Sequence, residues 1–266
     1  MRDPRDDSSH SSRTAVILAG GQGTRLRPYT VTLPKPLVPV GDRPIIEILL
    51  GQLVRDGFSR VIIAVGHMAG LIEAYCGDGS RWGLAIEYAR ETEPLGTAGP
   101  LATIANQLPD SFLVLNGDVL CDLDFSAFLS EHEQHPDSPI LTVSTHRRIL
   151  CSDYGVLETD SRGRVTAYHE KPTYDLDVSE GVYAFCRAAA EWIPPGEKID
   201  FPDLVSTLLI HQQTIIAREH RGIWLDIGRP DDYERAQELI AENADRFPSP
   251  LVGAAATDRR PVGKVV

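Results

Sequence analysis

The sequence has few cysteines and no long hydrophobic segment. Its four cysteines are scattered and form no Cys-x-x-Cys pair, so neither a zinc site nor a disulfide framework is expected. No apolar run approaches the roughly 18 to 20 residues that a membrane span requires. The first twelve residues are charged and rich in serine, without the apolar core of a signal peptide. We therefore expect a cytoplasmic protein with reduced thiols and no membrane partner.

Positive charge is also scarce. The chain of 266 residues has 26 Lys+Arg against 38 Asp+Glu, which gives a formal net charge of −12. Such a field repels the phosphates of nucleic acids, so a nucleic-acid partner is not expected. A small anionic ligand can still bind where basic residues are concentrated. Lysine is especially rare, since the chain contains only Lys35, Lys171, Lys198 and Lys264.

The alternation of short β-branched runs with helical patterns predicts one α/β domain over residues 14–247. Residues 1–13 and 248–266 lack periodicity and are expected to be flexible tails. The predicted sheet is Rossmann-like, mixed and mostly parallel, with flanking helices and an inserted β-rich lobe in the second half. The expected strands are 14–19, 61–65, 84–89, 112–115, 140–145, 155–158, 165–170, 181–185, 214–218 and 222–227. The expected helices are 45–54, 71–76, 98–106, 125–134, 202–211 and 231–243.

A glycine-rich segment, Gly20-Gly21-Gln22-Gly23-Thr24-Arg25, directly follows the first strand. Its spacing fits neither the dinucleotide pattern nor the Walker pattern. Bare backbone N–H groups at the carboxyl end of a buried strand can nevertheless cradle phosphate oxygens, and Arg25 adds a fixed positive charge. A simple tight turn is the alternative interpretation.

A proline-flanked lysine follows in Leu33-Pro34-Lys35-Pro36-Leu37. Proline fixes its own φ and pushes the preceding residue toward an extended conformation, so we expect Lys35 on a stiff, non-helical segment. A pre-positioned ammonium beside a glycine loop suits a polyphosphate. The alternative is a solvated surface lysine.

Together, these segments resemble the signature of the sugar-nucleotide pyrophosphorylases, nucleotidyltransferases that make NDP-sugars from an NTP and a sugar 1-phosphate. The resemblance is closest to the mannose-1-phosphate guanylyltransferase-like branch and covers about residues 14 to 243. It continues through the motifs Leu95-Gly96-Thr97-Ala98-Gly99, Asn116-Gly117-Asp118, Glu170-Lys171-Pro172 and Trp224-Leu225-Asp226-Ile227-Gly228. It implies the nucleotide-diphospho-sugar transferase fold, and homodimers or tetramers are usual in similar proteins.

The resemblance also implies roles for particular residues. Arg25 and Lys35 would be catalytic, and Asp118 and Asp226 would hold Mg²⁺, an ion that favours hard oxygen ligands. Nucleotide binding is implied for Leu18, Gly20, Gly21, Gly23, Thr24, Glu91, Gly96 and Thr97. Sugar-phosphate binding is implied for Asn116, Gly155, Glu170, Lys171, Ser179 and Gly181. Because Ser179-Glu180-Gly181 stands where similar proteins often have Asn-x-Gly, the sugar itself is not predicted.

Glu91 bears on which base is used. Similar enzymes that take uracil or thymine have a glutamine at this place, five residues before Gly96. An ionised carboxylate offers only acceptors, which match the adjacent N1–H and N2 amino donors of guanine. GTP is therefore expected as the nucleotide, with dTTP or UTP as the alternative. If Glu91 is instead an exposed loop carboxylate, it has no part in choosing the base.

Other classes of protein remain as alternatives. Asp122-Leu123-Asp124 is a DxD sequence of the kind found in glycosyltransferases, although Asp124 is better explained as a helix cap. A non-catalytic nucleotide-sugar-binding regulatory subunit is the other alternative. Such a subunit would have been free to lose its charged site residues, but all five are present: Arg25, Lys35, Asp118, Lys171 and Asp226. His132 and His135 do not match HExxH and are expected on a solvated helix face.

Overall fold

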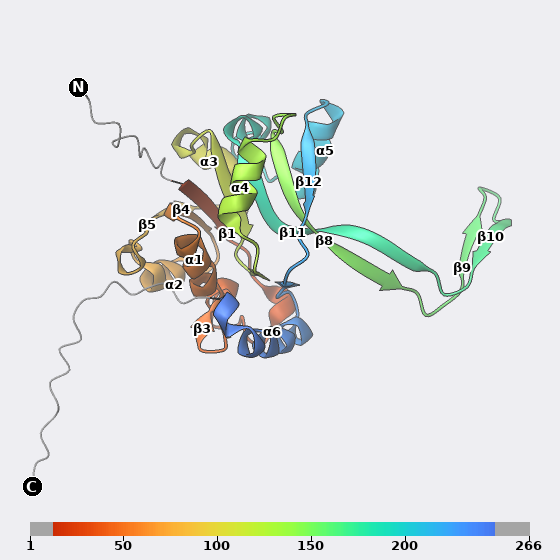
Figure 1. Cartoon of the computed structure of the whole chain (residues 1–266), viewed down its shortest axis with the longest axis horizontal. Helices are drawn as coiled ribbons and strands as arrows, with labels where there is room; N and C mark the ends of the chain where they lie inside the picture. Colours follow the sequence, from red (N-terminus) through yellow and green to blue (C-terminus); the bar gives the residue numbers. More distant parts are fainter. Residues whose placement is uncertain (1–12, 248–266) are drawn as a thin grey trace, which may run out of the picture.

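A central sheet of seven strands, in the order β12-β8-β11-β6-β1-β4-β5, organises the computed structural model, which describes residues 13–247 (Figure 1). The strands are β1 (Arg13–Ala19), β4 (Phe58–Val65), β5 (Ala85–Arg90), β6 (Ser111–Asn116), β8 (Leu141–Cys151), β11 (Thr173–Cys186) and β12 (Ile215–Glu219). The ladder is parallel everywhere except where β11 pairs with β6 and β8. The predicted mixed, mostly parallel sheet is therefore confirmed.

Helices cover both faces of this sheet. They are α1 (Ile45–Arg55), α2 (Ala69–Cys76), α3 (Gly99–Ile104), α4 (Phe125–Glu133), α5 (Phe201–Ile210) and α6 (Pro230–Glu242). Side chains of β1 alternate between two cores, since Ala15 and Ile17 pack in one cluster and Val16 in another. Burial on both faces explains why β1 is almost continuously apolar. None of the helices in the described part of the chain is long and apolar enough to cross a bilayer.

Short strand pairs lie beside the main sheet. They are β2 (Pro39–Val40) with β3 (Arg43–Pro44), β7 (Val119–Cys121) with β13 (Trp224–Asp226), and β9 (Val156–Thr159) with β10 (Val165–His169). The strand expected over 222–227 is thus reduced to three residues. The tails expected over 1–13 and 248–266 lie outside the described residues, apart from Arg13, which begins β1.

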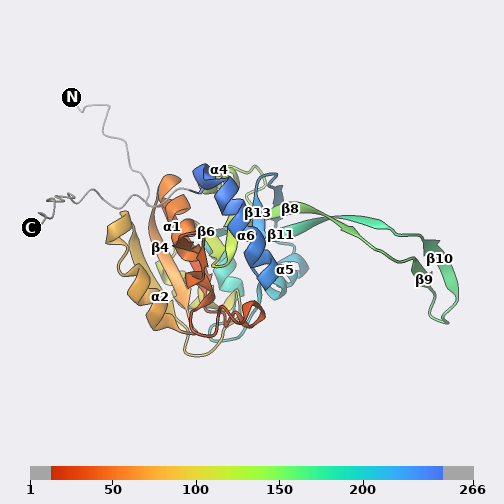
Figure 2. The ribbon, with the colours of Figure 1, turned by 90° about the horizontal axis from the view of Figure 1, so that it is seen from below.

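The inserted β-rich lobe is a long two-stranded arm. β8 and β11 run to 11 and 14 residues and continue to pair beyond the end of β12, from Val178↔His146 to Thr173↔Cys151. Figures 1 and 2 show this ribbon projecting from the body and carrying β9 and β10 at its far end. We call residues 147–177 the arm. Its exposed large apolar side chains are Ile149, Leu150, Tyr154, Leu157, Val165, Tyr168, Tyr174 and Leu176.

The expectation for His132 is wrong. Its residue is only 4% exposed, and its Nδ1 lies 2.8 Å from the hydroxyl oxygen of Thr142 on β8. Helical spacing places His132 on the same side of α4 as Phe128 and Leu129, four and three residues earlier, both of which are buried. Burial lowers the pKa of His132 to about 4. Asp124 does cap this helix as expected, accepting from the Ala127 N–H at 2.8 Å.

Candidate active site

A cavity of about 610 Å³ lies at the carboxyl ends of the central strands. Parallel strands bring the loops that follow them to one edge of the sheet, where ligands of open α/β sheets bind. Twelve of the residues singled out from the sequence line it: Leu18, Gly20, Gly21, Arg25, Glu91, Gly96, Thr97, Asn116, Asp118, Ser179, Gly181 and Asp226. The structure therefore brings most of the predicted site together.

Two carboxylates meet in this cavity from distant segments. Asp118 follows the end of β6, and Asp226 ends β13. Because β13 pairs with β7, Asp226 lies opposite Val119, the residue after Asp118. The Ile227 N–H also donates to the Asp118 carbonyl at 3.1 Å. The short β7–β13 ladder thus holds both acids at one place.

Lys35 joins the carboxylates, although its backbone differs from the expectation. It begins a short 3₁₀ turn, Lys35–Leu37, instead of lying in an extended segment. Pro36 is compatible with this turn because the first helical residues need no N–H donor. The Lys35 side chain is mostly buried, and its Nζ forms an ion pair with Asp118. The expectation of an extended backbone was wrong, whereas the ammonium does reach the predicted carboxylate.

The charges at this centre suit a cation. The protein surrounding Asp226 raises the pKa of its carboxyl, and the negative charge of Asp118 raises it further, while Lys35 and Arg25 oppose both. An ion near the two acids would relieve this repulsion. The donors are carboxylate oxygens, which Mg²⁺ prefers. The residues present therefore fit the Mg²⁺ that the sequence motifs imply.

Glu91 lies over the glycine loop. Its Oε2 accepts from the Leu95 N–H at 2.9 Å, and a Cβ at Gly20 would meet its Oε1 at 2.3 Å. A larger residue at position 20 would therefore displace this carboxylate from its place beside the loop. Partial burial raises the pKa of Glu91, while the hydrogen bond from Leu95 acts in the opposite direction.

On the opposite wall, Gly181 lies against Asn116. Its φ of +78° is unfavourable for other residues, and a Cβ there would lie 2.6 Å from the Asn116 side-chain nitrogen. Ser179, two residues earlier, lies 3.2 Å from the Tyr183 hydroxyl. These contacts place Asn116, Ser179 and Gly181 close together, and the sugar-binding role that the resemblance implies for them stays a prediction.

Several cavity residues were missed from the sequence. Tyr183 and Phe201 stack with ring centroids 3.8 Å apart and form an aromatic wall. Lys198 also lines the cavity, because the Ala98 and Gly99 N–H groups both donate to the Ile199 carbonyl. The rarity of lysine was the one signal that pointed to Lys198.

Three predicted sugar-phosphate residues lie elsewhere. Gly155, Glu170 and Lys171 are exposed on the arm and do not line the cavity. Glu170 accepts a hydrogen bond from the Tyr168 hydroxyl at 2.6 Å, next to Gly155. Gly23 and Thr24 belong to the loop but are also absent from the cavity lining. The structure does not bring these residues to the carboxylates, and their roles stay predictions.

A second cavity, of about 670 Å³, adjoins the first between the base of the arm and α6. The two cavities share Arg25, Trp224 and Asp226. The second is also lined by four further arginines, Arg147, Arg148, Arg229 and Arg235. Positive charge is thus concentrated beside the carboxylates in a chain that is strongly negative overall, as binding of a small anion requires.

Both aspartates of the DxD sequence make hydrogen bonds within the protein. Asp122 lies 3.0 Å from His220 Nε2 and accepts from the Ile223 N–H at 2.7 Å, while Asp124 caps α4. Neither residue lines the cavity that contains Asp118. This arrangement favours the nucleotidyltransferase interpretation over the glycosyltransferase one.

The fold and this site define the class of protein. The chain has the nucleotide-diphospho-sugar transferase fold. The model of the nucleotidyl transferase family matches residues 14–243, so the chain belongs to that family.

The curated relatives of this chain include both a uridylyltransferase and a guanylyltransferase subunit. The chain is 35% identical over 243 residues to UTP–glucose-1-phosphate uridylyltransferase of Synechocystis sp., a match covering 84% of this chain and 62% of the relative. It is 39% identical over 231 residues to the catalytic subunit beta of mannose-1-phosphate guanylyltransferase of Danio rerio, covering 82% and 62%. The chain thus spans about three fifths of the length of these curated relatives.

A solved structure has the same fold along its whole length. HddC from Yersinia pseudotuberculosis complexed with GMP-PN matches with a TM-score of 0.68 and 26% identity. The match covers 86% of this chain and 99% of that one.

Proposed function

We propose that this chain is a sugar-1-phosphate nucleotidyltransferase that joins an NTP, preferentially GTP, to a sugar 1-phosphate and releases pyrophosphate. The observation that carries this proposal is the meeting of Asp118, Asp226, Lys35 and Arg25 beside the glycine loop. Membership of the family and the names of both curated relatives support it.

The reaction needs positioning and charge neutralisation more than covalent help. A phosphate monoester has its second pKa near 6, so the sugar 1-phosphate is already largely ionised at neutral pH. One of its oxygens attacks the α-phosphorus of the NTP, the bond from that phosphorus to the bridging oxygen breaks, and pyrophosphate leaves. No general base is required.

The residues of the chain then have distinct tasks. Arg25 and the backbone around Gly20 and Gly21 bind the phosphates, and Lys35 places a positive charge next to Asp118. Mg²⁺ held by Asp118 and Asp226 would supply positive charge against the polyphosphate.

Glu91 supports the preference for GTP. Its carboxylate has acceptor capacity beyond the one hydrogen bond that Leu95 donates, and it lines the cavity. Guanine presents two adjacent donors to such a group, whereas uracil and thymine also present a carbonyl oxygen. One curated relative is named for guanylyl transfer and the other for UTP. Use of UTP or dTTP is therefore the alternative.

Pyrophosphate release tests the proposal. We expect release with Mg²⁺ for at least one pair in a matrix of the four NTPs and dTTP against hexose, amino-sugar and heptose 1-phosphates. Binding of a nucleotide sugar with no pyrophosphate release from any pair would instead support the regulatory-subunit alternative.

A further inference from the structure

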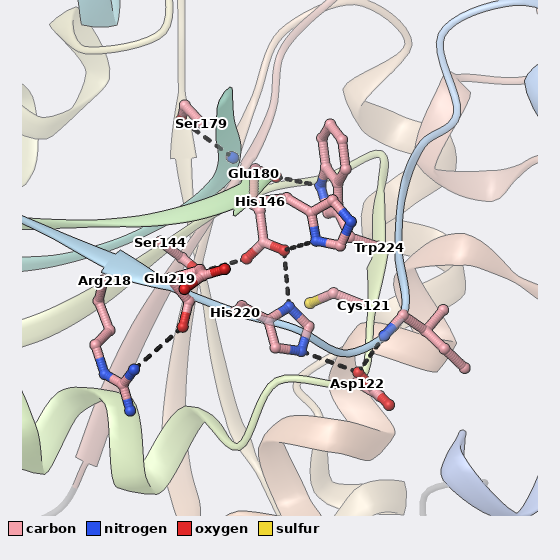
Figure 3. A network of polar contacts seen from close by, with 12 residues as sticks. Cys121, Asp122, Ser144, His146, Ser179, Glu180, Arg218, Glu219, His220 and Trp224 are labelled. Carbon is pink, nitrogen blue, oxygen red and sulfur yellow. Dashed lines mark hydrogen bonds and ion pairs between the residues drawn. The ribbon is translucent and has the colours of Figure 1, made fainter. Parts of the chain in front are cut away.

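Three potential metal ligands from separate segments meet where the arm joins the body. His146 lies on β8, Glu180 on β11, and His220 directly after β12. Glu180 Oε1 lies 3.5 Å from His146 Nδ1 and 2.7 Å from His220 Nδ1. One ligand atom from each residue lies within 4.8 Å of the other two. Figure 3 shows Glu180 between the two imidazoles.

The backbone of β11 explains how a glutamate reaches this buried place. The β8–β11 register shifts between Ser179 and Tyr183. Such an irregularity bends a strand and re-aims its side chains. The Glu180 side chain is fully buried, so its charge requires partners in the protein.

Neighbouring polar residues orient Glu180 and His220 through hydrogen bonds. The Ser144 hydroxyl donates to Glu180 Oε2, which leaves Oε1 for the histidines. Asp122 Oδ1 lies 3.0 Å from His220 Nε2 and is itself fixed by the Ile223 N–H. A carboxylate on the far nitrogen of a histidine is the usual support for a metal-bound imidazole, because it keeps the proton there and frees the other nitrogen.

His146 supplies a second, independent observation. Its Nδ1 is buried and has no hydrogen-bond partner among the described residues. The ring packs beside Trp224, with centroids 5.4 Å apart. Leaving a buried polar atom unpaired costs free energy, and a bound ion would satisfy this nitrogen.

We propose that His146, Glu180 and His220 bind one divalent transition-metal ion of the zinc class, with water as the fourth ligand. Tetrahedral zinc holds nitrogen and oxygen donors at about 2.0 to 2.2 Å, so the donors lie roughly 3.3 Å apart. The distances from Glu180 Oε1 to His146 Nδ1 and His220 Nδ1, 3.5 and 2.7 Å, bracket this value. On binding, the ion replaces the proton shared by His220 Nδ1 and Glu180, and that proton leaves to solvent.

The chemistry of the ligands separates this ion from the one proposed for catalysis. Imidazole nitrogens favour zinc, cobalt and nickel, whereas the oxygens of Asp118 and Asp226 favour Mg²⁺. The proposed zinc site adjoins both cavities, because Glu180 lines the substrate cavity between Ser179 and Gly181, and His146 lines the second cavity. The Trp224 indole N–H also donates to the Glu180 carbonyl at 3.0 Å. A bound ion would therefore fix both the base of the arm and the sugar side of the cavity.

Metal titration of the full chain tests this site without any activity assay. Protein stripped with a chelator is titrated with Zn²⁺ by calorimetry and with Co²⁺ by visible absorption, both in excess Mg²⁺. We expect one Zn²⁺ per chain and the intense visible bands of tetrahedral cobalt. His146→Phe, which keeps a ring beside Trp224, and His220→Asn should each weaken binding by more than about a hundredfold, beyond the effect of losing an outer-shell group.

Two controls make the result decisive. His169→Asn removes a histidine from an exposed pair with Glu158 on the arm and should leave binding unchanged. Asp226→Asn should also leave it unchanged. The proposal is overturned if the wild-type chain binds no stoichiometric Zn²⁺, if binding survives in both His146→Phe and His220→Asn, or if it is lost in Asp226→Asn.

Discussion

The sheet edge and the arm differ in how many contacts fix their side chains. At the sheet edge, Lys35, Asp118 and Asp226 are held by an ion pair and by the β7–β13 ladder. On the arm, Glu170 and Lys171 are exposed on a two-stranded ribbon whose apolar side chains face solvent. The comparison teaches that the carboxylate side of the cavity is preformed in this chain, whereas any contribution of the arm depends on where the ribbon lies.

The largest expected effect comes from breaking the preformed side. Asp226→Asn keeps the size of the side chain but removes a charge that the metal would bind. We expect pyrophosphate release to fall at least about a thousandfold, comparable to the loss of a major electrostatic contact in an active site. Circular dichroism should show an intact fold. Asp231→Asn, an exposed acid in the first turn of α6, is the matched control and should stay active. Full Mg²⁺-dependent activity in Asp226→Asn would remove this residue from the metal site.

A second change tests whether the preformed side also selects the base. Glu91→Gln replaces an acceptor-only group by an amide that both donates and accepts. The ratio of kcat/KM for GTP to that for UTP should fall by about one to two orders of magnitude, because an unpaired polar group in the site costs about 1 to 3 kcal/mol. Glu93→Gln, an exposed neighbour, should leave the ratio unchanged. A wild-type preference for UTP or dTTP would contradict the assignment.

Much of the sheet edge could be predicted from the sequence because its signals are local. An apolar run followed by glycines, or by Asn116-Gly117-Asp118, marks the end of a buried strand, and parallel pairing brings such ends together. The position of Lys171 could not be predicted in this way. It depends on six residue pairs by which β8 and β11 extend beyond the sheet, and alternation alone does not reveal how far two strands stay paired. His132 was missed because two neighbouring glutamates hid its place on the apolar side of α4.

The stability of the body should depend on pH through His132, a buried histidine with no counterpart on the exposed arm. The pKa of His132 is lowered from 6.5 to about 4 in the folded chain by burial, with the charge of His135 as the second cause. The unfolded chain therefore binds the proton more tightly, and the free energy of unfolding falls as the pH drops from 6.5 toward 4. The loss should be on the order of 2 to 3 kcal/mol, since one pKa unit corresponds to about 1.36 kcal/mol.

Urea unfolding at several pH values measures this dependence. His132→Asn is less stable overall because Thr142 loses its partner, but its stability should change less with pH over this window than that of the wild type. His169→Asn, on the exposed arm, should keep the wild-type dependence. Equal slopes for wild type and His132→Asn would show that other groups cause the acid sensitivity of the body.

The smallest expected effect distinguishes Lys171 from Lys198 as the proposed ligand of the sugar phosphate. Lys198 lines the cavity, whereas Lys171 lies on the arm and was assigned this role from its motif. We expect Lys171→Ala to raise KM for the sugar 1-phosphate about tenfold with a smaller change in kcat, since hydrogen bonds to charged groups contribute about 1.5 to 3 kcal/mol and exposure to solvent reduces this. Arg162→Ala, at an exposed position on the same arm, should leave KM unchanged. If Lys171→Ala also leaves KM unchanged while Lys198→Ala raises it, the phosphate is bound by the body alone, and the arm has no part in substrate binding.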